Sequence, residues 1–445
     1  MNVKLNMPED VKYILNKLNN NGYEAYIVGG CVRDSLLKKK PKDWDITTKA
    51  KPEQVIELFE KVILTGIKHG TVTVVINKEG YEVTTYRTDG QYEDNRHPKK
   101  VKFVTSLKED LARRDFTINA MAYNEENGLI DYFEGIEDLS KKIIKTVGNP
   151  NKRFNEDALR MLRAIRFSAQ LDFEIEESTI DAIKHLRNNI ENISKERIRE
   201  EFNKILIYKP NNINILKECG LLEYIIPEMI KAYNFNQNNI YHIYNLYEHS
   251  IVATEMIEPI LHLRLTMLLH DLGKIGTKTT DENGISHYYS HSNVSKKIAE
   301  KILKSLKYDN DTINKVKYLI EYHDDTLKTN ASIKWMLNKI GESLFLDLIK
   351  VQRADIKAQN KTYAKDRLMQ IDLIESKLNN ILEKDECFNL KKLKINGQNL
   401  MDIGFSKGKE IGDTLNYLLK LVIENPELNR KETLLEIVKV RNKNN

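Results

Sequence analysis

The amino-acid sequence predicts an α+β N-terminal region followed by a long, all-helical remainder. In roughly the first 135 residues, the runs TVTVVI and YEVTTYR alternate apolar and polar residues with the period of half-buried strands. From about residue 150 to the end, apolar residues instead recur every three or four positions, which is the pattern of helices that bury one face. Because strands and helices occupy separate parts of the chain, we expect an α+β architecture and not alternating strand and helix units.

The first expected elements follow one another closely. Residues 8–20 have the apolar spacing of an amphipathic helix, and the apolar run EAYIVGG, residues 24–30, is expected to be a strand. A short helix is expected over residues 32–37, and DWDITT, residues 43–48, is expected to form the next strand. The glycine pair at the end of EAYIVGG therefore connects a strand to a helix.

The composition is that of a soluble, folded protein. Of the 445 residues, 41% are hydrophobic and 30% are charged, and the formal net charge of +5 permits nucleic-acid binding without arguing for it. The three cysteines, Cys31, Cys219 and Cys387, are widely spaced in no metal or redox pattern, which is typical of a reducing compartment. No run approaches the roughly 18 apolar residues of a membrane span, and the N-terminus lacks a signal-peptide core, so we expect a cytoplasmic protein.

Two aspartates, Asp43 and Asp45, flank Trp44 in the expected strand DWDITT. Residues i and i+2 of a strand point to the same face, so both carboxylates should project together. They repel each other unless a cation lies between them, and their oxygen atoms suit Mg²⁺. A pair of Mg²⁺ ions is a standard means of phosphoryl or nucleotidyl transfer, whereas a solvated acidic pair at a strand end is the alternative.

The residues just before the aspartates favour the metal interpretation. Gly29 and Gly30 allow a ligand to approach the backbone closely, and the start of the following helix offers free N–H groups to an anion. Arg33, in the first turn of that helix, could donate two hydrogen bonds to a phosphate. Asp34 is expected to be structural, as an acid that is favourable near a helix N-terminus.

These residues belong to a series of motifs that resembles a known family. GGCVRDSLL followed by DWDIT is similar to the signature of the nucleotidyltransferases that share the head of DNA polymerase β. The closer resemblance is to the class II tRNA nucleotidyltransferases, or CCA-adding enzymes, and to bacterial poly(A) polymerases. In the family's order, the sequence continues with a flexible loop (RTDGQYEDNRHPKKVKF, 87–103), a second motif (RRDFTINAMAYN, 113–124), a third (DYFEGIEDL, 131–139) and a nucleotide-selecting motif (NEDALRMLRAIRF, 155–167).

The resemblance implies a division of the chain into four parts. Residues 1–140 would be a polymerase β-like catalytic head, and residues 141–240 an all-α neck and body for nucleotide selection and RNA binding. Residues 241–360 would be an HD metal-binding domain, and residues 361–445 a helical tail that binds tRNA. Within the body, the basic run of residues 187–206 is either a solvated helix face or a contact with the tRNA backbone.

The resemblance also implies the reaction, which is template-independent addition of CCA to the 3′ end of tRNA from CTP and ATP. Asp43 and Asp45 would be the catalytic residues and the Mg²⁺ ligands. Asp157 and Arg160 would select the base, and the remaining nucleotide contacts would come from Gly30, Arg33, Arg114, Arg163 and Arg166.

Selection of the base has a physical basis in the spacing of Asp157, Arg160 and Arg163. At three-residue spacing these side chains should share one side of a helix. The alternative to base selection is an ordinary salt bridge on the surface of that helix. An acid beside an arginine offers an acceptor and several donors, which matches the amine and ring nitrogen of cytosine and adenine but not uracil or guanine. Three residues have weaker assignments. Asp115 and Asn119 would contact the ribose or stabilise the local structure. Glu82 would be a third carboxylate facing the metal ions, or would simply be solvated.

A second group of histidines and aspartates lies between residues 241 and 360. Four of them match, in order, the metal ligands of an HD metal-dependent phosphohydrolase: His249, the pair His270–Asp271, and Asp355. Two further histidines, His291 and His323, occur where such enzymes often have ligands for a second metal ion. The resemblance implies a divalent metal and phosphate esters on RNA ends as substrates. A purely structural role is the alternative.

Other functions are compatible with the same motifs. An A-adding enzyme or a poly(A) polymerase shares the head, whereas the full length of the loop between Arg87 and Phe103 disfavours a CC-adding enzyme. From a different class, the chain could be an HD phosphohydrolase whose head only binds RNA. The partners that we expect are tRNA, ATP and CTP; no protein partner and no membrane is implied.

Overall fold

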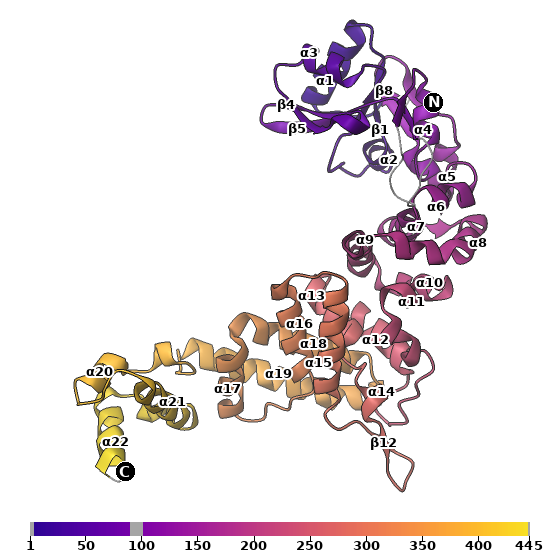
Figure 1. Ribbon diagram of the computed structural model, residues 1–445. Coiled ribbons are helices and arrows are strands. Elements are labelled where there is room, and N and C mark those ends of the chain that lie inside the picture. Colours follow the sequence, from indigo (N-terminus) through magenta and orange to yellow (C-terminus); the bar gives the residue numbers. More distant parts are fainter. Residues whose placement is uncertain (1–3, 90–100, 444–445) are drawn as a thin grey trace. The chain divides into compact units, whose positions relative to one another are not determined.

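The computed structural model describes residues 4–89 and 101–443 (Figure 1). The chain divides into two compact units, Met1–Pro227 and Glu228–Asn445. The four-part division into head, body, HD domain and tail stays a prediction. Nowhere in the described part of the chain is a helix long and apolar enough to span a membrane.

The first unit contains a mixed seven-stranded sheet, as expected for an α+β head (Figure 1). β1 and β2 are antiparallel, β2 and β5 are parallel, and the other pairs are antiparallel. β1 and β8 are buried along their whole length. In sheet order the strands are β3 (Val62–Gly66), β4 (Thr71–Ile76), β5 (Glu79–Thr85), β2 (Ile46–Thr48), β1 (Ala25–Val28), β8 (Met121–Asn124) and β9 (Gly128–Asp131).

Helices precede and interrupt this sheet. Four of them are α1 (Glu9–Asn20), α2 (Gly30–Leu36), α3 (Pro52–Leu58) and α4 (Leu107–Ala112). The expected loop over residues 87–103 begins and ends as a small antiparallel pair, β6 (Arg87–Asp89) with β7 (Val101–Phe103), and its residues 90–100 lie outside the described part.

The strand that we expected over residues 43–48 is only half correct. β2 begins at Ile46, and Asp43 to Asp45 form an irregular segment before it. The cause is the path of β1: the N–H of Val28 donates to the Asp45 carbonyl at 3.0 Å, and the chain then leaves the sheet at Gly29, whose φ is +78°. No part of β1 remains to pair with Asp43, because α2 begins at Gly30, two residues earlier than expected.

The rest of the first unit is helical, as the periodicity predicts. α7 packs against α9 and turns Met161, Leu162 and Ile165 into the core. A two-residue parallel pair, β10 (Ile143–Ile144) with β11 (Glu174–Ile175), is a small exception. The helices are α5 (Gly135–Lys141), α6 (Pro150–Glu156), α7 (Leu159–Leu171), α8 (Glu177–Leu186), α9 (Lys195–Tyr208), α10 (Ile213–Glu218) and α11 (Leu222–Ile225).

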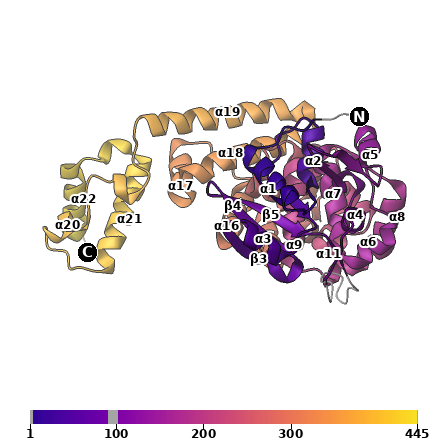
Figure 2. The same cartoon turned by 90° about the horizontal axis from the view of Figure 1, so that it is seen from above.

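As far as it is described, through residue 443, the second unit is helical apart from the short hairpin of β12 (Thr279–Thr280) and β13 (Ser286–His287). One apolar cluster joins α12, α13 and α16 to α19, and another joins α20 to α22; Figure 2 shows the long helix α19 leading from the first group to the second. The helices are α12 (Leu246–Glu255), α13 (Leu261–Leu269), α14 (Lys274–Thr277), α15 (His291–Ser305), α16 (Asn310–Tyr322), α17 (Asn330–Ile340), α18 (Glu342–Lys357), α19 (Lys361–Glu383), α20 (Gly397–Met401), α21 (Lys409–Glu424) and α22 (Lys431–Lys443).

Candidate functional site

Three carboxylates gather at the end of β2 in the first unit. Asp43 and Asp45 precede β2, and Glu82 lies on its parallel neighbour β5, where Val83 pairs with Ile46. Burial raises the pKa of Asp45, Arg114 opposes that effect, and Asp43 adds to it. Burial also raises the pKa of Glu82, and both aspartates raise it further. The three negative charges therefore repel one another, and a cation would relieve that repulsion.

This carboxylate group is open and does not form a closed cage. Among residues 4–89 and 101–443, two groups of three or more potential ligands have atoms within 4.8 Å of one another, and neither includes Asp43 or Asp45. Mg²⁺ commonly takes one or two carboxylates and completes its octahedron with water and substrate phosphate oxygens. An open pair of carboxylates fits Mg²⁺ in that role.

Gly29 gives an arginine access to the carboxylates. A Cβ at Gly29 would lie 2.8 Å from Nη1 of Arg114, and the φ of +78° is strained for residues with a side chain. Burial lowers the pKa of Arg114, although Asp110 and Asp45 favour its charge. Its Nε is buried and has no hydrogen-bond partner within the described residues. Arg114 therefore places a buried guanidinium, whose hydrogen bonds are incomplete within the described residues, close to the carboxylates.

Arg33 is held firmly in place at 4% exposure. Its Nε donates to Oδ1 of Asp34 at 2.8 Å, and its Nη1 donates to Oδ1 of Asn119 at 2.7 Å. The guanidinium also lies 5.1 Å from the ring centre of Phe167. Asp34, which we expected to act on the helix dipole, instead fixes this arginine, and Asn119 has the structural role that we considered for it.

Beside Arg114 lies a cavity of about 260 Å³. Of the residues that we predicted to bind the nucleotide, the structure brings Arg114, Asp157, Arg160 and Arg163 to its wall, whereas Gly30, Arg33 and Arg166 do not line it. The sequence interpretation missed two arginines of this wall. The complete lining is Arg113, Arg114, Asp115, Asp157, Arg160, Arg163 and Arg197.

Asp157 is not on one helix with Arg160 and Arg163, contrary to our expectation. α6 ends at Glu156, Asp157 has an extended backbone with φ of −140°, and α7 begins at Leu159. The Asp157 carboxylate accepts the N–H of Leu159 at 3.0 Å, so this residue ends α6 and its side chain bonds to the first residue of α7. A short polar side chain that can bond to a nearby backbone N–H thus overrode the helical spacing.

The two other arginines of the motif are paired with acids. Arg163 donates to Oδ2 of Asp115 through both Nε, at 2.9 Å, and Nη2, at 2.5 Å. Burial alone would raise the pKa of Asp115, but Arg163 outweighs it and keeps that pKa below its ordinary value. Arg166 donates to Oε2 of Glu201 at 2.8 Å, and both of these side chains are less than 10% exposed. Arg166 therefore stabilises the packing of α7 against α9.

We expect Arg166→Met to lower the free energy of unfolding by about 3–5 kcal/mol, because it leaves the Glu201 carboxylate buried without its partner. Burial raises the pKa of Glu201, but Arg166 and Arg163 lower it overall. The pair therefore stabilises the fold above the ordinary carboxyl pKa and loses this effect as the pH falls through the depressed value. Denaturant unfolding at several pH values should show a deficit that is largest at neutral pH and shrinks in acid.

Lys204→Met is the matched control for this prediction. Its Nζ lies 3.6 Å from the same carboxylate but is half exposed, so the loss should stay below about 1 kcal/mol. Equal losses in the two variants would contradict the buried-pair explanation.

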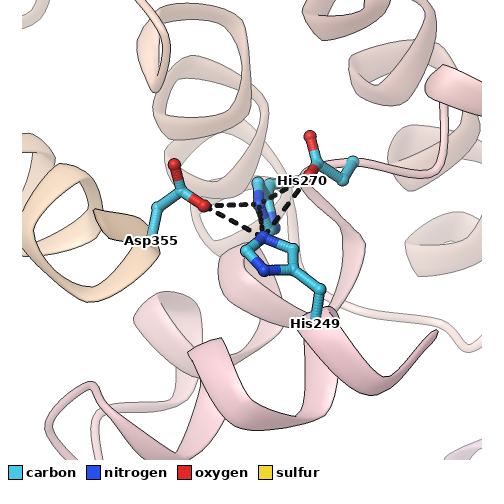
Figure 3. Close-up of side chains that lie close together, drawn as sticks. His249, His270 and Asp355 are labelled. Atoms are coloured by element: carbon cyan, nitrogen blue, oxygen red, sulfur yellow. Dashed lines mark hydrogen bonds and ion pairs between the residues drawn. The ribbon is translucent and has the colours of Figure 1, made fainter. Parts of the chain in front are cut away.

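The second unit brings together the four residues of the predicted HD site. Nε2 of His249 lies 3.0 Å from Oδ1 of Asp355 and 3.5 Å from Oδ2 of Asp271. Nε2 of His270 lies 3.4 Å and 3.3 Å from the same two oxygens. Figure 3 shows His249, on α12, and His270, which directly follows α13, meeting Asp355, on α18. These atoms form a closed group of potential metal ligands, and all four residues are buried.

The other oxygen of Asp271 faces a second group. Oδ1 lies 3.3 Å from Nε2 of His291 and 3.6 Å from Nε2 of His323, and these three residues form the other buried set of potential ligands. Oδ1 has no hydrogen-bond partner within the described residues. One carboxylate therefore joins two adjacent sets of potential ligands, and together the two sets suit a pair of metal ions.

The hydrogen bonds of the four histidines leave their Nε2 atoms as acceptors. Each Nδ1 faces a backbone carbonyl, which only accepts, so in the neutral ring Nδ1 carries the hydrogen and Nε2 carries a lone pair. The carbonyls are those of Ala358, Met267, Tyr288 and Ile320, at 3.4, 2.8, 2.9 and 2.7 Å from His249, His270, His291 and His323, respectively.

These lone pairs face one another. The Nε2 atoms of His249 and His270 are 3.3 Å apart, and those of His291 and His323 are also 3.3 Å apart. Lone pairs at that separation need a cation or a proton between them. The donor set of imidazole nitrogens and carboxylate oxygens fits a divalent transition metal or Mg²⁺ in each position.

A cavity of about 560 Å³ opens onto these ligands. Two cationic residues that we did not single out from the sequence line it. Lys274 is 5% exposed and contacts Asp271 at 2.7 Å, and Arg367 reaches the cavity from α19. The lysine was detectable, since it stands one turn after Asp271 in HDLGK. A cationic wall beside a metal-ligand cluster suits a phosphate ester.

Known proteins resemble both units. A family model described as the poly A polymerase head domain matches residues 25–145. A model of a probable RNA- and SrmB-binding site of polymerase A matches residues 172–233, and one of a putative tRNA nucleotidyltransferase domain 2 matches residues 277–438.

Among curated proteins, the CCA-adding enzyme of Ligilactobacillus salivarius is 36% identical over 98% of this chain and 97% of its own length. That of Oceanobacillus iheyensis is 55% identical over 43% of this chain and 48% of its own length. Among solved structures, the CCA-adding enzyme of Bacillus stearothermophilus in complex with CTP has a TM-score of 0.71 and 29% identity, with 99% of this chain and 100% of that one covered. The Thermotoga maritima CCA-adding enzyme complexed with tRNA shares the fold at a TM-score of 0.63 and 21% identity, over 98% of this chain and 96% of that one.

Proposed function

The chain belongs to the CCA-adding enzyme family, and from this premise we propose that its own catalytic centre is the carboxylate pair Asp43 and Asp45. The enzyme is a nucleotidyltransferase that adds CCA to the 3′ end of tRNA, with CTP and ATP as the nucleotide substrates and without a nucleic-acid template. The observation that supports the assignment of residues is the position of Arg114. Its charge acts on Asp45, and its side chain also lines the arginine-rich cavity.

In this proposal, the 3′ hydroxyl of tRNA attacks the α-phosphate of CTP or ATP, and pyrophosphate leaves. Asp43 and Asp45 would hold Mg²⁺, which when bound promotes loss of the hydroxyl proton and neutralises charge on the phosphate. Arg114 would stabilise the triphosphate by its positive charge, because it lines the cavity and acts on Asp45. Arg33 supplies a fixed positive charge beside Gly30, where the absent side chain lets phosphate approach.

Selection of the base is assigned to Asp157 and Arg160. Both line the cavity, and both are held by other contacts, so they present an acceptor and donors in fixed positions. The amine and ring nitrogen of cytosine and adenine match this pair, whereas uracil and guanine offer a carbonyl oxygen where the amine would be. Arg163 adds positive charge to the same wall.

The decisive experiment incubates the enzyme with tRNA that lacks CCA and each labelled nucleoside triphosphate, singly and together. We expect two additions from CTP alone and a third only when ATP is also present. A long A tract would instead indicate a poly(A) polymerase, and addition of A only to tRNA that already ends in CC would indicate an A-adding enzyme. Either result would overturn the CCA assignment.

We propose a second activity, a metal-dependent phosphohydrolase, at the HD cluster of the second unit. The observation that favours it is that the Nε2 lone pairs of two histidines face each other in each ligand set, and that both sets include Asp271. His249, His270, Asp271 and Asp355 would hold one divalent ion, and Asp271 with His291 and His323 would hold a second. Such ions activate water at neutral pH, and Lys274 and Arg367 would bind the phosphate of the substrate. Release of phosphate from an RNA end by a protein loaded with Mn²⁺ tests this activity.

A further inference from the structure

The acid proposed to select the base is held by an arginine from a distant part of the chain. Nη2 of Arg197, on α9, donates to Oδ2 of Asp157 at 2.9 Å, and its Nη1 approaches Oδ1 at 3.5 Å. The side chain of Arg197 is 26% exposed and that of Asp157 is 18% exposed, so the pair is partly screened from water. Both residues line the 260 Å³ cavity.

Arg160, the other base-selecting residue, is held by a separate set of contacts. Its Nη1 donates to Oε2 of Glu156 at 2.7 Å, and its Nη2 donates to the carbonyl of Arg113 at 3.0 Å. The acceptor and the donors of the selecting pair are therefore oriented independently. Arg197 fixes the acceptor, while Glu156 and the Arg113 carbonyl fix the donors.

We propose that Arg197 is a positioning residue for nucleotide selection, which holds the Asp157 carboxylate in the orientation that accepts a hydrogen bond from the amine of cytosine or adenine. This inference rests on the proposed role of Asp157. The N–H of Leu159 fixes only one oxygen of that carboxylate, at 3.0 Å. Arg197 binds the other oxygen, so it prevents the carboxylate from rotating about its last bond. A carboxylate oxygen still has a lone pair free for the base.

The test compares kcat/KM for CTP and for UTP on tRNA lacking CCA. In Arg197→Gln, the Asp157 carboxylate can rotate and should no longer keep its orientation relative to the donors of Arg160. The preference for CTP over UTP should therefore fall by about 10- to 100-fold. The loss should arise as a higher KM for CTP with kcat largely retained, because the reacting phosphate is held elsewhere. Arg197→Lys should recover part of the preference, since lysine supplies one point of charge but no fork.

Two further variants keep the result interpretable. Lys204→Ala, on the same helix, removes a half-exposed cation that pairs with Glu201, and it should leave the CTP preference unchanged. Asp157→Ala tests the proposed function itself: if it leaves the preference unchanged, the base-selecting assignment fails. A second outcome overturns only the role of Arg197. In that outcome Asp157→Ala reduces the preference for CTP, whereas Arg197→Gln leaves it unchanged or lowers the use of CTP and UTP equally.

Stability is the remaining control. A purely structural arginine would lower the melting temperature without changing the ratio of CTP to UTP use. Should Arg197→Gln fail to fold, Arg197→Lys decides alone. A reduced preference at an unchanged melting temperature supports the inference, and an unchanged preference overturns it.

Discussion

Asp43→Asn and Asp45→Asn should each reduce nucleotide addition by about 1,000-fold or more while tRNA binding is retained. A metal-bound transition state gains several kcal/mol from its ion, and each 1.4 kcal/mol is tenfold in rate. The variants should fold normally, because each removes one member of a group of carboxylates that repel one another. Addition of labelled CTP to tRNA lacking CCA, together with tRNA binding by gel shift, measures both expectations.

The control for these variants is Glu53→Gln, which neutralises an exposed acid on α3 and should leave the rate unchanged. Glu82→Gln shows whether the third carboxylate contributes to the same site. If either aspartate variant retains nucleotide addition within tenfold of the unsubstituted enzyme, the catalytic assignment is wrong. If both variants lose tRNA binding as well, the aspartates act in the fold or in RNA binding and not in the chemical step.

The sequence predicted that Asp43 and Asp45 act together, but for a geometric reason that does not hold. We expected the two side chains to share a face of one strand, whereas both residues precede β2. They approach Glu82 because the backbone of Asp45 is bonded to β1 and because β5 runs parallel beside β2. Sheet order is set by long-range pairing, which a local alternation pattern does not contain.

The contacts of Asp157 were beyond prediction for a related reason. Three-residue spacing suggests a shared helix face, but an aspartate can equally end a helix and bond to the start of the next one, and local spacing does not decide between these states. Arg197 lies in a basic run that we interpreted as a solvated face or an RNA contact. Its pairing with Asp157 spans 40 residues, so only the packing of α9 on α7 reveals it.

In the second unit, the order of histidines and aspartates along the chain predicted which side chains come together, but not how the two groups are joined. All six side chains are buried, in two groups that share Asp271. From the sequence, this grouping was predicted only through the family resemblance. That Asp271 turns one oxygen to each set is a property of the structure. It has a direct consequence for metal binding.

Asp271→Asn should abolish binding of both metal ions, whereas substitution of a residue that belongs to only one ligand set should abolish binding of one ion. The unsubstituted protein, loaded with Mn²⁺ and desalted, should carry two ions per chain, because Asp271 offers Oδ2 to His270 at 3.3 Å and Oδ1 to His291 at 3.3 Å. His323→Ala, in the second set alone, should leave one ion, and so should Asp355→Asn in the first. Metal content by mass spectrometry gives the counts, and the melting temperature with and without chelator gives a second readout.

The pattern across the three variants separates a shared carboxylate from two independent sites. Binding of an ion at 100 times its dissociation constant stabilises the fold by about 2.7 kcal/mol, so the metal-dependent rise in melting temperature should vanish in Asp271→Asn and be roughly halved in the others. CCA addition should persist in all three, because the head carboxylates are unchanged. Loss of both ions in His323→Ala would mean that the two positions fill only together. One ion retained in Asp271→Asn would show that Asp271 does not join them.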